Sequence, residues 1–192
     1  MTDLPTRDRL LEAAAGLFYA EGITAVGVDR ICSAAGVSKR SLYALFGTKD
    51  ALVAASLERF GERIVAGYLP ATAMVDGDQP SPREQILGVF TWLESAAATP
   101  DYEGCPFVSA ATELKDPAHP AAAVAKRFKD RLTAFFESAA RSAGAPDPAD
   151  LAQQLTVVFD GCGDRVVVTG HALNGLPTRM ATTLLDAAGV RR

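Results

Sequence analysis

Apolar residues recur at intervals of three or four positions along most of this chain. That spacing places them on one face of an α-helix, so the pattern predicts a structure built from amphipathic helices. Residues 7–21 form the first such segment, and Gly22 is a stop signal directly after it. Thr48 can cap a later segment that reaches Ala66. The apolar positions of these two segments are Leu10, Leu11, Ala14, Leu17, Phe18, Val53, Leu57, Phe60 and Ile64.

Residues 28–47 predict two short helices joined by a tight turn. Gly36 fits the turn because glycine takes a positive φ without steric cost, and Ser38 can cap the second helix. Ile31 and Ala35 share one face of the first helix, and apolar residues of the second can point back toward them. The residues predicted to close this seam are Val37, Leu42 and Leu45.

Cationic, hydroxylic and aromatic residues gather at the start of that second helix. They are Lys39, Arg40, Ser41 and Tyr43, behind the cap Ser38. The first turns of a recognition helix reach base edges and phosphates, so this pattern favours DNA binding. The alternative is a plain helical hairpin with a solvated, charged face. The amphipathic helices on both sides favour a compact DNA-binding head instead.

The first 69 residues resemble the N-terminal domain of the TetR-type transcriptional repressors. The stretches that carry the resemblance are Arg9-Leu10-Leu11-Glu12-Ala13-Ala14, Leu17-Phe18, Glu21-Gly22, Ile31, Ala35-Gly36-Val37-Ser38-Lys39, Leu42-Tyr43, Phe46 and Lys49-Asp50-Ala51-Leu52. The resemblance implies an all-helical homodimer with two recognition helices in successive major grooves of a palindromic operator. It also implies that a small molecule entering the C-terminal domain releases the double-stranded DNA.

By position, the resemblance assigns DNA contacts to Ser38, Lys39, Arg40 and Tyr43, and a phosphate contact to Lys49. The chain departs from the family at Val26 and Gly27, where a pair of hydroxyl residues is usual. A phosphate contact expected there is either missing or made by a backbone N–H group or by Thr24.

The charge of the chain is unusual for a nucleic-acid binder, at −4 overall. Residues 1–50 hold six basic and six acidic groups, so DNA affinity must come from where the cations sit. We expect modest non-specific binding. The start of the chain lacks the apolar core of a signal peptide, and no run approaches the roughly 20 apolar residues of a membrane span. The sequence therefore predicts a cytoplasmic protein without a membrane partner.

Beyond Leu69, residues 70–80 predict a turn-rich connector, and a new helix starts at Ser81-Pro82-Arg83-Glu84. Further helices are expected at 106–114, 121–143, 151–170 and 177–188. The residues of 121–143 expected to be mostly solvated are Lys126, Arg127, Lys129, Asp130 and Arg131. The fold class is therefore all-α. We expect a helix-turn-helix DNA-binding domain (1–48), a connecting helix (49–68) and a helical domain for effector binding and dimerisation (69–192).

The segment 151–170 is apolar around more of its surface than one buried face requires, and 177–188 supplies a last helix with Met180, Leu184 and Leu185. Gly161, Cys162 and Gly163 are small enough for two helices to approach closely. We expect these segments to form a four-helix interface in a homodimer, as the resemblance implies. The alternative is that both pack onto their own subunit.

Aromatic residues of the second half are the candidates for binding a small hydrophobic effector, although most fit an ordinary core equally well. Asp160 and Glu113 are carboxylates near apolar faces that either orient an effector or cap a neighbouring helix. The predicted ligand-binding residues are Phe60, Phe90, Trp92, Cys105, Phe107, Phe128, Phe159 and Asp160.

Patterns for catalysis, metals and cofactors are missing from the sequence. Gly161-Cys162-Gly163 lacks the third glycine of a dinucleotide loop, and the three cysteines form no C-x-x-C pair. We expect no metal, no cofactor and no enzyme activity. Cys105 and Cys162 are buried small residues or, alternatively, redox-active thiols. The function predicted is a ligand-released repressor. The alternatives are a helical interaction protein or an enzyme without regulated operator binding.

Overall fold

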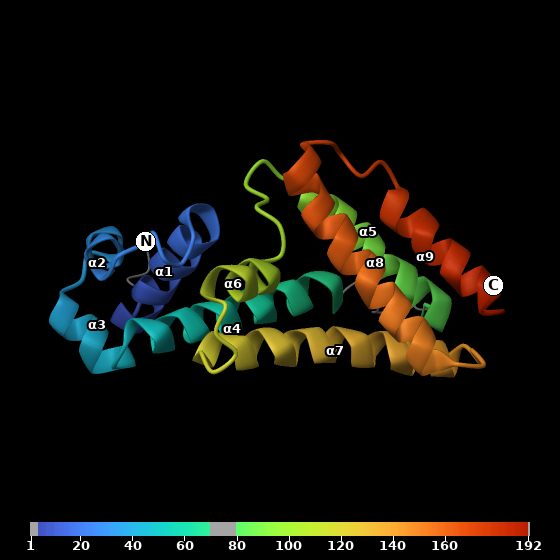
Figure 1. Cartoon of the computed structure of the whole chain (residues 1–192), viewed down its shortest axis with the longest axis horizontal. Helices are drawn as coiled ribbons and strands as arrows, with labels where there is room; N and C mark the ends of the chain where they lie inside the picture. Colours follow the sequence, from blue (N-terminus) through green and yellow to red (C-terminus); the bar gives the residue numbers. More distant parts are fainter. Residues whose placement is uncertain (1–3, 70–79, 192) are drawn as a thin grey trace. The chain divides into compact units, whose positions relative to one another are not determined.

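Nine α-helices make up the part of the chain that the structure, a computed structural model, describes: residues 4–69 and 80–191. Those residues contain no β-strand, which confirms the all-α prediction (Figure 1). The predicted connector, 70–80, lies outside the described residues except for Pro80. The helices are α1 Thr6–Glu21, α2 Val28–Ala35, α3 Lys39–Phe46, α4 Lys49–Tyr68, α5 Pro82–Ala97, α6 Pro106–Leu114, α7 Pro120–Ser142, α8 Pro148–Thr169 and α9 Leu176–Ala187.

Local signals begin and end these helices where the sequence predicts. Gly36 follows α2 with a φ of 64°, the left-handed conformation that a glycine accepts at no cost. Ser81 and Glu84 form a complete capping box at the start of α5. Asp147 accepts a hydrogen bond from the Asp150 N–H at the start of α8. Each of these ends therefore needs only residues that are close in sequence.

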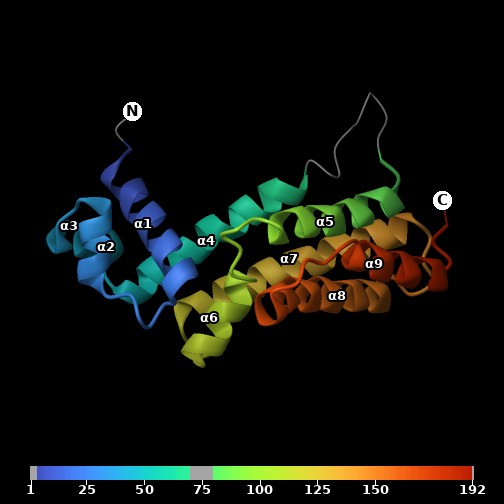
Figure 2. The same ribbon diagram turned by 90° about the horizontal axis from the view of Figure 1, so that it is seen from above.

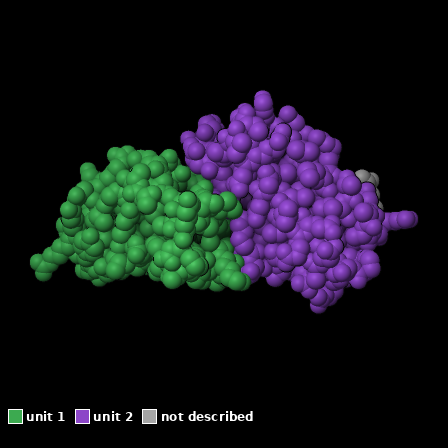
Figure 3. Space-filling model, viewed as in Figure 1, with its two compact units in different colours: residues 1–63, 106–128 green, residues 64–105, 129–192 purple. Residues whose placement is uncertain are grey.

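The chain forms two compact units (Figure 3). Unit 1 contains residues 1–63 and 106–128, and unit 2 contains residues 64–105 and 129–192. α4 and α7 are continuous helices whose first residues belong to unit 1 and whose last residues belong to unit 2. The division into DNA-binding, connecting and effector domains concerns function, and it stays a prediction.

Unit 1 is built around the packing of α1, α2 and α3 on one another (Figure 2). Leu10 of α1, Ile31 of α2 and Leu42 of α3 are fully buried there. Leu45, by contrast, is 43% exposed, so the prediction that it joins the buried seam is wrong. α3 is short and buries Leu42 as its only residue, which leaves its remaining surface open.

Unit 2 is built around α5, α8 and α9, which pack against one another. Phe90 of α5 stacks on Phe136 of α7 with ring centroids 5.5 Å apart, and both side chains are fully buried. Phe159 of α8 meets Phe90 edge-on at 6.2 Å. In the described residues of both units, no helix has the length and apolar character that crossing a bilayer requires.

Candidate nucleic-acid interface

α3 presents its polar residues outward from a fixed base. The Ser38 hydroxyl oxygen accepts a hydrogen bond from the Ser41 N–H at 3.1 Å and lies 3.0 Å from the Ser41 hydroxyl. Leu42 anchors the inner face of the helix, while Tyr43 is 48% exposed. The cap and the anchor hold the first turn of α3 in a defined orientation, as a helix that reads base edges requires.

The two cations at the start of α3 differ in their surroundings. The Lys39 ammonium lies 2.6 Å from the Asp29 carboxylate of α2, and this pair raises the pKa of Lys39. Arg40 is exposed and, among the described residues, makes no ion pair or hydrogen bond. Its five N–H donors are therefore open to an external acceptor such as a guanine edge or a phosphate.

Lys49 and Thr24, both predicted DNA contacts, form hydrogen bonds to other residues of unit 1. The Lys49 ammonium donates to the Ile23 carbonyl oxygen at 2.6 Å and lies 5.8 Å from the centre of the Phe18 ring. The Thr24 N–H donates to Glu113 at 2.7 Å, and the Thr24 hydroxyl also bonds to that carboxylate. A phosphate has to compete with these intramolecular partners.

The comparisons with known proteins match this geometry. Residues 10–56 match the family model of bacterial regulatory proteins, tetR family. A putative TetR transcriptional regulator from Streptomyces avermitilis is 49% identical over 98% of this chain and 100% of its own, with a TM-score of 0.88. The regulator SCO4454 of Streptomyces coelicolor is 29% identical over 96% of this chain and 93% of its own, with a TM-score of 0.79.

A curated relative is similar in sequence to this chain over most of its length. The HTH-type transcriptional regulator YjdC of Escherichia coli is 24% identical over 84% of this chain and 83% of its own. The chain belongs to the TetR family. It is a DNA-binding transcriptional regulator and not an enzyme.

The predicted ligand-binding residues divide between the two units. Unit 1 holds Phe60, which contacts the Tyr19 ring at 4.9 Å, and the stacked pair Phe107 and Phe128 at 5.3 Å. Unit 2 holds Phe90, Trp92, Cys105, Phe159 and Asp160. In unit 2, Phe159 contacts the rings of both Phe90 and Trp92, as a ligand site or an ordinary core would require.

Lys129 of α7 is a polar group in unit 2 that sequence reasoning missed. Its side chain is 23% exposed, so the prediction that it is mostly solvated is wrong. The ammonium pairs with Asp160 and lies 5.9 Å from the centre of the Phe159 ring, which is stacked on Trp92. Burial alone would lower the pKa of Lys129, but its interactions with Cys105 and Asp160 outweigh burial and raise it.

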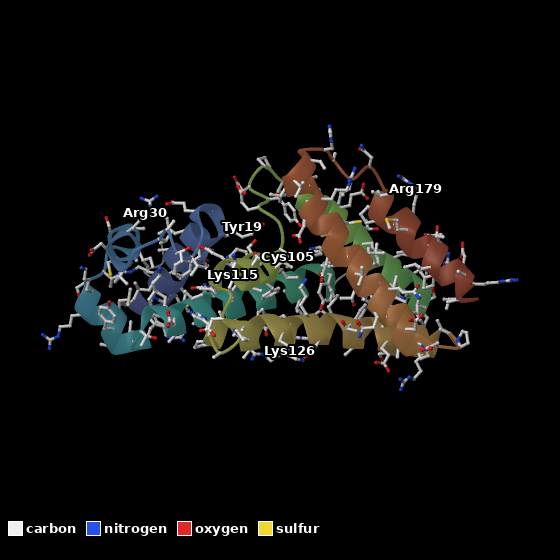
Figure 4. The ribbon with its side chains drawn as sticks, in the orientation of Figure 1. Tyr19, Arg30, Cys105, Lys115, Lys126 and Arg179 are labelled. Carbon is white, nitrogen blue, oxygen red and sulfur yellow. The ribbon has the colours of Figure 1, made fainter. Side chains whose placement is uncertain are left out.

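Cys105 lies between α5 and α6, with Lys115 directly after α6 (Figure 4). The Cys105 N–H donates to the Asp164 carboxylate of α8 at 3.3 Å. Cys162 is buried, and burial raises the pKa of its thiol. No group of three or more His, Cys, Asp or Glu side chains that would suit a metal ion occurs within residues 4–69 and 80–191.

The small residues of α8 face different surroundings. A Cβ atom built on Gly163 would lie 2.9 Å from the Tyr102 hydroxyl, so Gly163 packs within its own subunit. Gly161 has no atom of its surroundings within 4 Å of such a Cβ. Val157 and Val168, which share the face of Gly161 at helical spacing, are 69% and 83% exposed. This face is apolar and uncovered in one chain.

Proposed function

We propose that this regulator is a repressor whose homodimer binds a palindromic operator and leaves it when a small hydrophobic effector binds. Residues 1–48 read the DNA, residues 49–68 form the helix that connects the two domains, and residues 69–192 bind the effector and dimerise. Base and phosphate contacts come from Ser38, Lys39, Arg40, Ser41 and Tyr43. Lys49 and Thr24 contribute phosphate contacts at the edge of the head.

The exposed Arg40 on the anchored helix α3 is the observation that carries the DNA half of this proposal. A two-fold operator needs two such helices, because one head reads one half-site. The apolar face of α8 around Val157, Gly161 and Val168, together with Met180 of α9, which is 41% exposed, supports the dimer. A self-complementary apolar patch is what a two-fold interface uses.

The Lys129–Asp160 pair beside Phe159 and Trp92 supports an effector site in unit 2. Apolar walls with a few placed polar groups are typical of sites for small hydrophobic ligands. Since α4 and α7 run from unit 1 into unit 2, a ligand that shifts either helix also acts on the chain leading to the DNA-binding head.

The effector claim is tested by screening hydrophobic compounds for two signals together, quenching of the single Trp92 and loss of operator binding. A release of about 100-fold requires the ligand to favour the DNA-free conformation by about 2.7 kcal/mol. The Cys105→Trp variant, which fills space near Lys129, should blunt the release. Compounds that change Trp92 emission and never change operator affinity would contradict the effector half of the proposal.

The dimer claim is tested with Val157→Glu, which places a charge on the exposed face of α8. Sedimentation should give folded monomers with weakened operator binding, because a buried unpaired charge opposes association. Ala134→Glu, which adds the same charge at an exposed position of α7, is the control for charge alone. A Val157→Glu variant that stays dimeric would move the interface elsewhere.

A further inference from the structure

Glu113, near the end of α6, binds the turn between α1 and α2. Its carboxylate accepts hydrogen bonds from the Ile23 N–H at 2.8 Å and the Thr24 N–H at 2.7 Å, and it also bonds to the Thr24 hydroxyl. Gly22, with a φ of 87°, brings the backbone close to this carboxylate. Three donors from two consecutive residues therefore converge on one side chain about 90 positions away.

The other side of the same turn is also fixed. Lys49, the first residue of α4, donates to the Ile23 carbonyl oxygen. Partial burial alone would raise the pKa of Glu113, but the hydrogen bonds from Thr24 and Ile23 and the charge of Lys49 outweigh it and lower that pKa. The carboxylate is thus ionised at neutral pH and keeps all its acceptor sites for this turn.

This turn matters because α2 has no cap of its own. α2 starts at Val28 behind Gly27, and no side chain accepts its first N–H groups. α2 carries α3 through the Gly36 turn and through the Lys39–Asp29 pair. The position of the turn at residues 22–24 therefore influences where α2 begins and how α3 is presented.

We propose that Glu113 is a positioning residue for DNA reading, which fixes the turn at residues 22–24 and thereby the orientation of α2 and α3. The inference uses the DNA binding of the TetR family and does not depend on the proposed repressor action or effector. The role of α6 in this proposal is to carry Glu113 to the turn.

If Glu113 instead competes with DNA for this turn, its removal should change the DNA affinity in the opposite direction. The N–H groups of Ile23 and Thr24 are of the kind that bind phosphate, so Glu113 would then act as an internal competitor of DNA. Removing a competitor strengthens binding to every DNA sequence. Removing a positioning residue weakens binding to the operator and leaves random DNA almost unaffected, because only base readout needs the exact orientation of α3.

The experiment measures the affinities of the full-length protein, without effector, for its operator and for random DNA at fixed salt. The operator is the sequence that the wild type selects from a random pool. Glu113→Gln should weaken operator binding about tenfold, because the amide has no charge and turns an NH2 donor toward one of the two backbone N–H groups. Glu137→Gln, which breaks an exposed pair with Arg141 on α7, makes the same charge change and is the matched control.

Two further measurements separate positioning from general damage. Thr24→Val keeps both N–H bonds and removes the hydroxyl, so a loss of about twofold to threefold should occur on the operator and not on random DNA, whereas loss of a phosphate contact by Thr24 would weaken binding to both. Amide hydrogen exchange at Ile23 and Thr24 should be slow in the wild type and fast in Glu113→Gln, with the core of α1 unchanged. The exchange data decide the matter even if Glu113→Gln lowers stability.

Three results would overturn the proposal. The first is operator binding by Glu113→Gln equal to that of Glu137→Gln. The second is tighter binding of the variant to operator and random DNA by one common factor. The third is exchange at Ile23 and Thr24 that is equally fast in the wild type and in Glu113→Gln. The proposed effector response is measured separately, by adding compound, so its failure leaves these outcomes unaltered.

Discussion

The outer face of α3 and the Lys129 cluster of unit 2 both hold cationic and aromatic residues, but in opposite surroundings. The Lys129 cluster consists of Lys129, Asp160, Phe159 and Trp92. On α3, Arg40 and Tyr43 are exposed, while the Ser38 cap and the buried Leu42 fix the helix. In unit 2, Lys129 is mostly buried, and its partner Asp160 lies 31 positions away on another helix. The first arrangement leaves donors for an external partner, and the second uses them inside the fold.

Because of this difference, binding residues and structural residues of the same chain can be separated by measuring DNA binding and stability. A substitution on the outer face of α3 should change DNA binding and leave stability nearly unaltered. A substitution in the Lys129 cluster should change stability even without DNA.

Leu42→Ala should lower the free energy of unfolding by about 2–5 kcal/mol, because it empties a fully buried site under α3. Leu45→Ala is the matched control on the same helix. Because Leu45 is 43% exposed, that change should cost less than about 0.5 kcal/mol. Urea unfolding measures both. Equal losses would mean that both faces of α3 are buried, against the exposed surface described here.

Lys129→Met should cost about 1–3 kcal/mol at neutral pH, since it leaves Asp160 without its charged partner. The folded protein raises the pKa of Lys129, so this stabilisation is complete below the unfolded pKa of about 10.4 and is lost as the pH rises through the folded value.

Urea unfolding of the wild type and Lys129→Met between pH 6 and pH 11 checks that prediction. The difference in unfolding free energy should stay constant up to about pH 9 and shrink above about pH 10.4. Arg40→Met is the control with an exposed cation and should show almost no difference at any pH. A constant difference for Lys129→Met up to pH 11 would contradict a stabilising charge.

Asp29→Asn should have the smallest effect, because the Lys39–Asp29 pair is largely exposed. Freeing Lys39 should strengthen binding to random DNA about twofold to threefold at low salt, and the gain should vanish at high salt. The affinities of Glu137→Gln provide the baseline for the change in net charge. A gain no greater than this baseline would mean that Asp29 does not hold Lys39 back from phosphates.

The sequence predicts those parts of the fold that depend on neighbouring residues. Gly36, Ser38 and Ser81 carry their own conformational preferences, so the turn and the two caps are found where expected. The buried and exposed positions of α3 are also predicted from the spacing of its apolar and polar residues, except for Leu45. An apolar side chain suggests burial, but α3 buries Leu42 and leaves Leu45 43% exposed.

Long-range partners are not predictable in this way. Lys129 looks like one of several solvated cations in a basic stretch, and only its pairing with α8 makes it a buried group. Glu113 is recognisable as a carboxylate near an apolar face, yet its partners Ile23 and Thr24 are fixed by tertiary packing. Gly161 and Gly163 look equivalent in sequence, and only the position of Tyr102 separates them.

We propose that the exposed face of α3 reads DNA sequence through Arg40. The most direct measurement is the affinity of Arg40→Ala for the selected operator and for random DNA, at one salt concentration, beside its unfolding free energy. We expect operator binding to weaken by about 1–3 kcal/mol, with random-DNA binding and stability nearly unchanged. An equal small loss on both DNAs would make Arg40 a phosphate ligand, and no loss on either would remove α3 from the interface.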